Sequence, residues 1–170
     1  PLRHRLEGLA AQAVRRTRGL LEVRFHGALP NEEVEILLSG GRFHVFGLAC
    51  RVAEDGDRDG LPVALMEAQA HGVPVVTRSL PGFEETLRDG IGAVLLPYVD
   101  DEVLTPLFAD ALARFGEDAP YRRRMARQAR GEAGRRASTH DVGTRLHAML
   151  AKVCSSLRGD PVGVSSAGQG

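Results

Sequence analysis

The sequence predicts an α/β domain in which a parallel β-sheet is flanked by helices. Short apolar runs alternate with segments whose apolar residues recur at helical spacing, and this alternation is typical of parallel sheets. The run 73–77 is apolar and mostly β-branched, as expected of a strand that is covered on both faces. With 170 residues, of which 43% are hydrophobic, the chain is long enough for one domain with a buried core.

The expected elements follow one another along the chain with recognisable boundaries. Strands are expected at residues 20–26, 43–49, 73–77 and 91–96. Helices are expected at residues 1–17, 32–39, 61–71, 84–88, 105–115, 118–136 and 140–157. Asn31 is expected to cap the second helix, and Thr105 with Pro106 to open the fifth. Residues 158–170 are rich in Gly and Ser, which predicts a disordered tail.

The stretch 55–76 combines a charged loop, a helix and a buried strand. In a helix from about residue 61 to residue 71, Glu67 lies less than two turns from the start. Asp59 stands just before this helix, and Gly60 leaves the backbone accessible. The amides of a first helical turn favour an anion. The pattern therefore predicts a site for a ligand that carries both a phosphate and hydroxyl groups.

A calcium loop is an alternative interpretation of the same stretch. Residues Asp55, Asp57, Asp59 and Gly60 match the first, third, fifth and sixth positions of an EF-hand loop. The twelfth position, which requires a bidentate Glu, is Met66, and Glu67 comes one residue late. Pro62 also interrupts the loop. These mismatches argue against calcium, and no metal or cofactor is expected.

A second interpretation fits this stretch without a shift. Asp59 and Glu67 are separated by seven residues, within Gly-Asp-Arg-Asp-Gly-Leu-Pro-Val-Ala-Leu-Met-Glu-Ala. This resembles the nucleotide-sugar signature of retaining GT-B glycosyltransferases of family 4, the glycosyl transferases group 1. Four further stretches resemble motifs of that family in the same order, namely residues 23–27, 45–50, 81–85 and 89–97. The resemblance covers residues 2–150.

The resemblance implies a fold and a role for each site residue. The fold would be the Rossmann-like second half of a GT-B enzyme, which binds the donor. Glu67 would accept hydrogen bonds from the ribose hydroxyls of a UDP- or GDP-sugar, and Asp59 would contact the transferred sugar. The amides of Gly60 and Leu61 would approach the sugar or pyrophosphate. Glu85 is expected to secure its turn rather than to contact the ligand.

Two departures from the family pattern leave the donor sugar open. Asp59 stands where Glu is commoner, and Ala49 stands where Pro usually precedes Cys50. The form with Asp nevertheless resembles a branch of the family that is associated with bacterial polysaccharide assembly.

The resemblance also implies that the first strands of the half-domain are missing. In the strand order 3-2-1-4-5-6, they would lie between strands 20–26 and 43–49, so that strand 43–49 keeps a bare edge. We therefore expect residues 1–157 to be part of a longer transferase and to be inactive alone, the acceptor being bound by an N-terminal domain. A non-catalytic nucleotide-sugar-binding module, a decayed fragment and a sugar-nucleotide epimerase remain alternatives.

Composition narrows the class of protein further. The net charge is zero, which gives no indication of nucleic-acid binding. Cys50 and Cys154 are too far apart in sequence for a CxxC pair, and the histidines form no ligand motif. With no apolar run of membrane-spanning length, a cytoplasmic protein is expected, and peripheral membrane contact stays open. The arginines of residues 122–130 are interpreted as a solvated or membrane-facing surface.

Overall fold

A computed structural model of the chain describes residues 2–53 and 62–136. The chain divides into two compact units, Pro1–Ile36 and Leu37–Gly170, and each is considered by itself. The predicted helix 140–157, the predicted tail 158–170 and three predicted site residues, Asp59, Gly60 and Leu61, lie outside the described residues.

The first unit contains helix α1, Leu2–Arg16, close to the predicted bounds. The strand predicted at residues 20–26 is wrong, because the segment forms no ladder with any described residue. Its side chains are exposed, Leu20 to 93%. Val23 and Phe25 alternate with charged residues, which favours an extended backbone, but a strand also requires a neighbour whose N–H and C=O groups complete the ladder.

Helix α2, Asn31–Ser39, begins within the first unit and ends in the second. The carbonyl of Pro30 accepts the amides of Glu33 at 3.0 Å and Val34 at 3.2 Å. Pro30 therefore precedes the helix in the N-cap position, and the prediction that Asn31 caps it is wrong by one residue. Leu38 is the buried residue of this helix, as its apolar spacing indicates.

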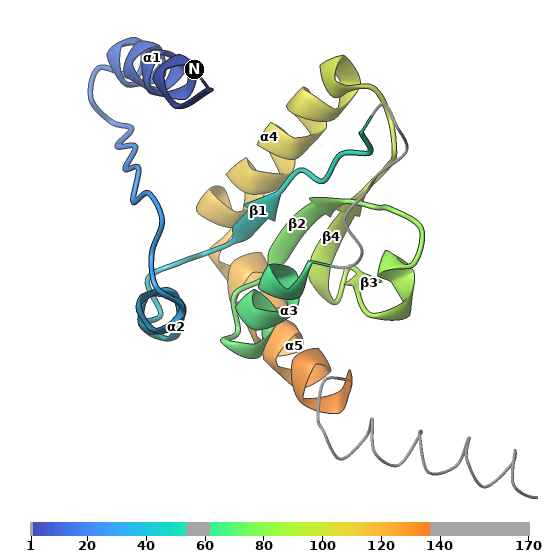
Figure 1. Ribbon diagram of the computed structural model, residues 1–170. Coiled ribbons are helices and arrows are strands. Elements are labelled where there is room, and N and C mark those ends of the chain that lie inside the picture. Colours follow the sequence, from blue (N-terminus) through green and yellow to red (C-terminus); the bar gives the residue numbers. More distant parts are fainter. Residues whose placement is uncertain (1, 54–61, 137–170) are drawn as a thin grey trace, which may run out of the picture. The chain divides into compact units, whose positions relative to one another are not determined.

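The second unit contains a four-stranded sheet in the order β1-β2-β4-β3 (Figure 1). The strands are β1, Phe46–Leu48, β2, Val75–Arg78, β3, Arg88–Asp89, and β4, Gly92–Leu96. Every neighbouring pair is parallel, which confirms the predicted fold class. All four residues of β2 are buried, as predicted for a strand covered on both faces. Strand β1 lies at an edge of the sheet, as expected for residues 43–49.

The helix predicted at residues 84–88 is wrong. A single 3-10 turn, Phe83–Glu85, occupies its beginning, and β3 occupies its end. Gly82 precedes the turn with φ 96°, and Gly90 follows β3 with φ 76°, so left-handed glycines enclose the segment on both sides. Leu87 is 1% exposed, so its burial directs the chain into the core instead of along a helix.

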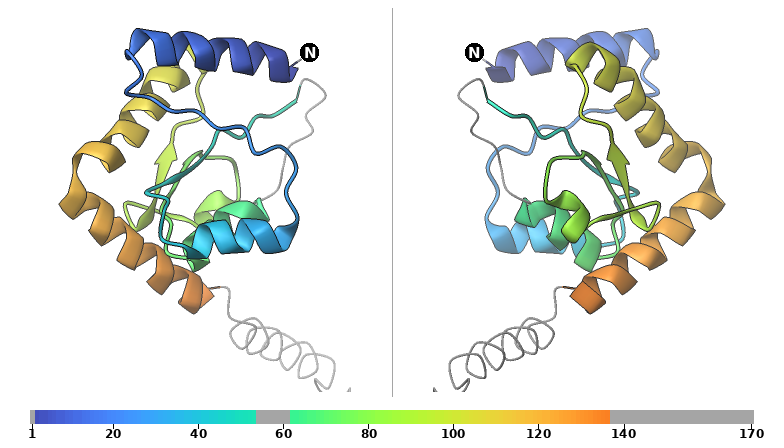
Figure 2. Two further views of the ribbon diagram at one scale, coloured as in Figure 1. Left: turned by 90° about the vertical axis from the view of Figure 1, so that its left-hand side faces the viewer. Right: turned by 90° about the vertical axis from the view of Figure 1, so that its right-hand side faces the viewer.

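Three helices cover the sheet, namely α3, Val63–Ala70, α4, Asp101–Glu117, and α5, Ala119–Arg136. Helices α3 and α4 lie on opposite faces of the sheet, with α5 following α4 at an angle (Figure 2). The alternation of side chains along β2 agrees with this arrangement. Val76 packs in the core cluster with Leu104 and Phe115 of α4, while Val75 is fully buried although it points the other way.

Helix α4 begins at Asp101, four residues before the predicted start at Thr105. The carbonyl of Asp100 accepts the amides of Val103 at 3.0 Å and Leu104 at 2.8 Å, and Leu104 is buried. Pro106 thus lies inside the helix, where it removes one backbone donor. The acidic first turn and the burial of Leu104 outweigh this loss.

The bounds of helix α5 agree closely with the predicted helix at residues 118–136. The Asp118 carboxylate accepts the amide of Tyr121 at 2.8 Å, which is an N-cap bond. Tyr121 and Met125 are buried in the core cluster, and the Tyr121 ring packs on Phe115 with 5.1 Å between the ring centroids. The same helix contacts β4, where Gly92 lies against the backbone of Ala129.

Candidate functional site

Glu67 lies on the second turn of α3, as the sequence predicts. Leu65, Ala68 and Gln69 of this helix are buried, whereas Glu67 is exposed. Its carboxylate makes no hydrogen bond or ion pair with any residue in the described ranges. Within the described ranges, Glu67 therefore does not serve as a structural partner.

The backbone places the beginning of α3 at the carboxyl edge of the sheet. Helix α3 connects the carboxyl end of β1 to the amino end of the parallel strand β2, so its own N-terminus lies near the edge where both strands end. Pro62 precedes it with φ −64° and ψ 127°. In parallel α/β sheets, ligands bind at this edge, and helix amides there favour anions.

Helix α3 is fixed from three sides, which gives Glu67 a rigid base. Leu65 and Ala68 are fully buried. The buried amide of Gln69 donates through Nε2 to the carbonyl of Gly92 at 3.1 Å, which ties α3 to β4. At the C-terminal end, Arg130 donates through Nη2 to the carbonyl of His71 at 3.0 Å.

The structure adds a carboxyl-edge cluster, which the sequence analysis missed: Arg51, Arg78, Tyr98 and Asp101. Arg78 ends β2, and its side chain is only 5% exposed. It donates through Nη2 to Asp101 Oδ1 at 2.5 Å, and Arg51 lies at 2.6 Å from Asp101 Oδ2. The Arg78 guanidinium also lies 5.4 Å from the centre of the Tyr98 ring.

The sequence contains one signal for this cluster. Arg51, Arg78 and Tyr98 each stand at or just after the end of a predicted strand, so the carboxyl ends of a parallel sheet bring them to one edge. Two guanidinium groups share one carboxylate there, and the cluster therefore keeps an excess of positive charge.

The carboxyl-edge cluster predicts a pH dependence of stability. The hydrogen bond from Arg78, aided by the charge of Arg51, lowers the pKa of Asp101 below its ordinary value of 3.8, against a smaller opposing effect of burial. A lowered pKa stabilises the fold at pH values above 3.8, and this stabilisation disappears as the pH falls through the folded-state pKa. Asp101→Asn should therefore lower the unfolding midpoint at neutral pH.

Thermal unfolding of the wild type and Asp101→Asn across pH measures this effect. The difference between the two midpoints should shrink as the pH falls below 3.8. A difference that stays constant to low pH would show that ionisation of Asp101 contributes nothing to stability.

The turn after β2 is held by Glu84. Ser79 donates through Oγ to Glu84 Oε1 at 2.6 Å, and this hydrogen bond is the main reason why the pKa of Glu84 is lowered. Glu85, which was expected to secure the turn, also has an interaction of its own. The Ser79–Glu84 bond shows that the neighbouring acid takes at least part of that role.

The described residues contain neither a cluster of metal ligands nor a membrane-spanning helix. Within residues 2–53 and 62–136, no three His, Cys, Asp or Glu side chains lie close enough to hold a metal ion. No helix in the same ranges is long and apolar enough to cross a membrane. Asp55, Asp57 and Asp59 lie outside those ranges, so the calcium alternative is not tested.

A family model described as "Glycosyl transferases group 1" matches residues 12–132, which is most of the chain. The chain belongs to the glycosyl transferases group 1 family. The match includes the stretch with Asp59 and Glu67 as well as the whole described sheet. It confirms the resemblance that the signature indicates.

Curated relatives carry names that agree with this family. The chain is 35% identical over 115 residues to a protein of Salmonella typhimurium (strain LT2) named as the colanic acid biosynthesis glycosyltransferase WcaL, covering 64% of this chain and 28% of that protein. It is 36% identical over 85 residues to the amylovoran biosynthesis glycosyltransferase AmsK of Erwinia amylovora, covering 50% of this chain and 20% of AmsK.

A mycobacterial relative differs in its named substrates. The chain is 37% identical over 70 residues to the GDP-mannose-dependent alpha-(1-6)-phosphatidylinositol monomannoside mannosyltransferase of Mycolicibacterium smegmatis, covering 41% of this chain and 18% of that enzyme. The matched segment thus spans at most 28% of the length of these three relatives.

Proposed function

We propose that this chain is the donor-binding part of a retaining glycosyltransferase that transfers a sugar from a UDP- or GDP-sugar to a sugar or lipid-linked acceptor. The observation that carries the proposal is the exposure of Glu67 and the lack of polar contacts to its carboxylate within the described residues. Its carboxylate is exposed and makes no polar contact with the described residues, yet it stands on a helix that is fixed on three sides. It also occupies the place of the second acid of the family signature.

The chemistry of a carboxylate suits this role. Its two oxygens can accept hydrogen bonds from the two adjacent hydroxyls of a ribose at the same time. Each charge-assisted hydrogen bond of this kind contributes about 1.5–3 kcal/mol. Glu67 thereby distinguishes a ribonucleotide from ligands that lack the hydroxyl pair.

Asp59, Gly60 and Leu61 complete the proposed site. Asp59 is assigned to the hydroxyls of the transferred sugar, and the amides of Gly60 and Leu61 to its phosphate side. The position of these residues just before α3 supports the assignment, since the first-turn amides and the helix dipole stabilise the negative charge of the nucleotide leaving group. The proposed reaction requires no metal ion or further cofactor.

The names of the relatives support the class of acceptor. Two are named for the biosynthesis of colanic acid or amylovoran, and a third for a phosphatidylinositol monomannoside. We therefore assign the chain to polysaccharide or glycolipid assembly, where a lipid-linked acceptor would bring the enzyme to a membrane surface. Because the chain matches only part of these relatives, we expect sugar transfer to require more than these 170 residues.

The proposal predicts that Glu67→Ala weakens the binding of the preferred nucleotide-sugar about tenfold or more, because at least one charge-assisted hydrogen bond is lost. The measurement is a calorimetric titration of UDP- and GDP-sugars into the wild-type chain and the variant. Glu117→Ala is the matched control. Glu117 is also exposed, but it is the last residue of α4, at the opposite end of that helix from the carboxyl edge of the sheet.

Equal affinities for the wild type and Glu67→Ala would contradict the proposal. Binding that depends on Glu67 without sugar transfer by any longer form of the protein would favour the alternative of a non-catalytic nucleotide-sugar-binding module.

A further inference from the structure

Helix α5 concentrates positive charge on a chain whose net charge is zero. The helix contains seven arginines and one glutamate. That glutamate, Glu132, is 5% exposed and accepts a hydrogen bond from Arg135 at 2.6 Å, so it does not offset the charge of the exposed face. The face of α5 that points away from the core is therefore basic.

The arginines of α5 differ in their contacts. Arg122 donates to the carbonyls of Phe115 and Gly116, and Arg124 lies 5.2 Å from the centre of the Tyr121 ring. These side chains have roles within the fold. Arg123 and Arg127 are exposed and make no hydrogen bond or ion pair with any residue in the described part of the chain.

Arg123, Arg127 and Arg130 form a single line, which we call the arginine stripe. Their spacing of four and three residues places them on one side of a helix, opposite the buried Tyr121, Met125 and Ala129. Arg130 uses Nη2 for the carbonyl of His71, and its other N–H groups can still donate. The stripe therefore presents donors along two turns of the helix.

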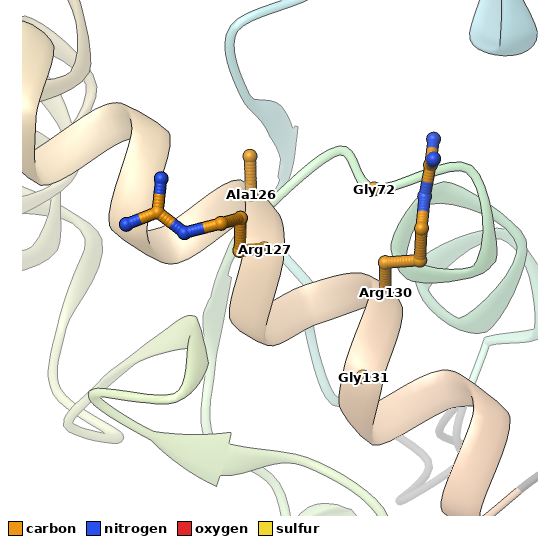
Figure 3. A pocket seen from close by; sticks show the side chains of 5 residues that line it. All are labelled: Gly72, Ala126, Arg127, Arg130 and Gly131. Atoms are coloured by element: carbon orange, nitrogen blue, oxygen red, sulfur yellow. The ribbon is translucent and has the colours of Figure 1, made fainter.

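A pocket of about 400 Å³ lies beside the stripe. It is lined by Gly72, Ala126, Arg127, Arg130 and Gly131. In Figure 3, the side chains of Arg127 and Arg130 project from α5 on either side of Ala126, with Arg130 directed toward Gly72. The lining contains two cations and no acidic side chain, which suits the phosphate of a headgroup.

We propose that the arginine stripe and its pocket bind the surface of an anionic lipid membrane. The composition of the face favours lipid over the other polyanions. Apart from its two arginines, the pocket is lined by Gly72, Ala126 and Gly131, and the tyrosine of the helix, Tyr121, is buried. Among the described residues, the lining of the pocket thus contains no aromatic ring on which a nucleic-acid base can stack and no large apolar side chain to anchor a protein partner. Lipid headgroups suit this face, because their phosphates can move within the membrane surface to meet the arginines.

This inference goes beyond the proposed donor site and does not depend on it. The pocket lies at the C-terminal end of α3, whereas the donor residues are assigned to its N-terminal half and the loop before it. A membrane contact at this end leaves the carboxyl edge of the sheet accessible to a nucleotide-sugar.

Sedimentation of the 170-residue chain with lipid vesicles tests the proposal. The chain should bind vesicles that contain phosphatidylglycerol and should not bind vesicles of phosphatidylcholine alone, and salt should weaken the binding. Arg123→Glu combined with Arg127→Glu should reduce binding at least about tenfold, because each arginine near an anionic surface contributes appreciably. Circular dichroism checks that the variant is folded.

Two matched variants keep the result interpretable. Arg42→Glu with Arg88→Glu changes the net charge equally at exposed positions outside α5, and it should bind like the wild type. Arg123→Gln with Arg127→Gln removes the charge without reversing it, and it should give an intermediate loss. Equal losses in the α5 and control variants would overturn the proposal, because net charge alone would then explain binding.

Two competitors distinguish the remaining sources of phosphate. Release of the chain from vesicles by inorganic phosphate at constant ionic strength would show a site for the free ion and would overturn the assignment to a membrane. Tighter binding to a single-stranded oligonucleotide than to the vesicles, lost in the same α5 variant, would assign the stripe to nucleic acid instead. Failure to bind phosphatidylglycerol vesicles would also overturn the proposal.

Discussion

Gly92→Ala is expected to destabilise the unit that contains the sheet by about 2–5 kcal/mol, through overpacking and positive φ together. Gly92 begins β4 with φ 71°, a conformation that costs energy for any residue with a Cβ atom. A Cβ there would meet the backbone of Ala129, at 2.5 Å from its nitrogen. Because this neighbour is helix backbone, α5 would have to move away from the sheet.

Gly90→Ala separates the two causes. Gly90 also has a positive φ, 76°, but a Cβ there meets no atom within 4 Å. Its substitution should therefore cost only about 1–2 kcal/mol, the price of the backbone conformation. Urea unfolding of both variants and the wild type gives the comparison. Equal losses of stability would show that α5 does not pack on β4 as closely as described.

Phe115→Ala is expected to cost about 3–5 kcal/mol, the usual range for truncating a buried phenylalanine. Phe115 is fully buried at the end of α4 and packs with Tyr121 and Met125 of α5 and with Val76 of β2. Its ring therefore joins two helices and the sheet. Since a whole domain is stable by only about 5–15 kcal/mol, this loss should be evident in any unfolding experiment.

Phe108→Ala is the matched control for this prediction. Phe108 is on the same helix but only partly buried, and it packs against the core cluster from outside. It should lose clearly less stability than Phe115→Ala, because fewer of its contacts are removed from water. If Phe108→Ala were the more damaging change in urea unfolding, the centre of the core would lie elsewhere.

The sequence predicted the elements whose signals are local. Strand β2 was predictable because Val73, Val75, Val76 and Thr77 form a short β-branched run, and α5 because Asp118 caps it and its apolar residues recur at helical spacing. Glu67 was placed correctly on its helix for the same reason. In each case, residues close in sequence determine the conformation.

The predictions that were wrong or missing share a physical cause. Each of these features depends on residues that are distant in sequence. The segment 20–26 has the composition of a strand, but pairing requires a neighbour that composition does not supply. The start of α4 depends on burying Leu104, which outweighs the signal of Pro106. In the carboxyl-edge cluster, Arg78 and Asp101 are 23 residues apart and meet only because parallel strands bring their ends together.

The central claim is that the Glu67 carboxylate holds the ribose of the donor. A thermodynamic cycle tests it directly, in which the wild type and Glu67→Ala are each titrated with the preferred nucleotide and its 2′-deoxy form. If the contact exists, removal of the 2′-hydroxyl should weaken binding to the wild type about tenfold and should change binding to Glu67→Ala little. Equal losses in both proteins would contradict the account, since the hydroxyl would then be bound by another residue.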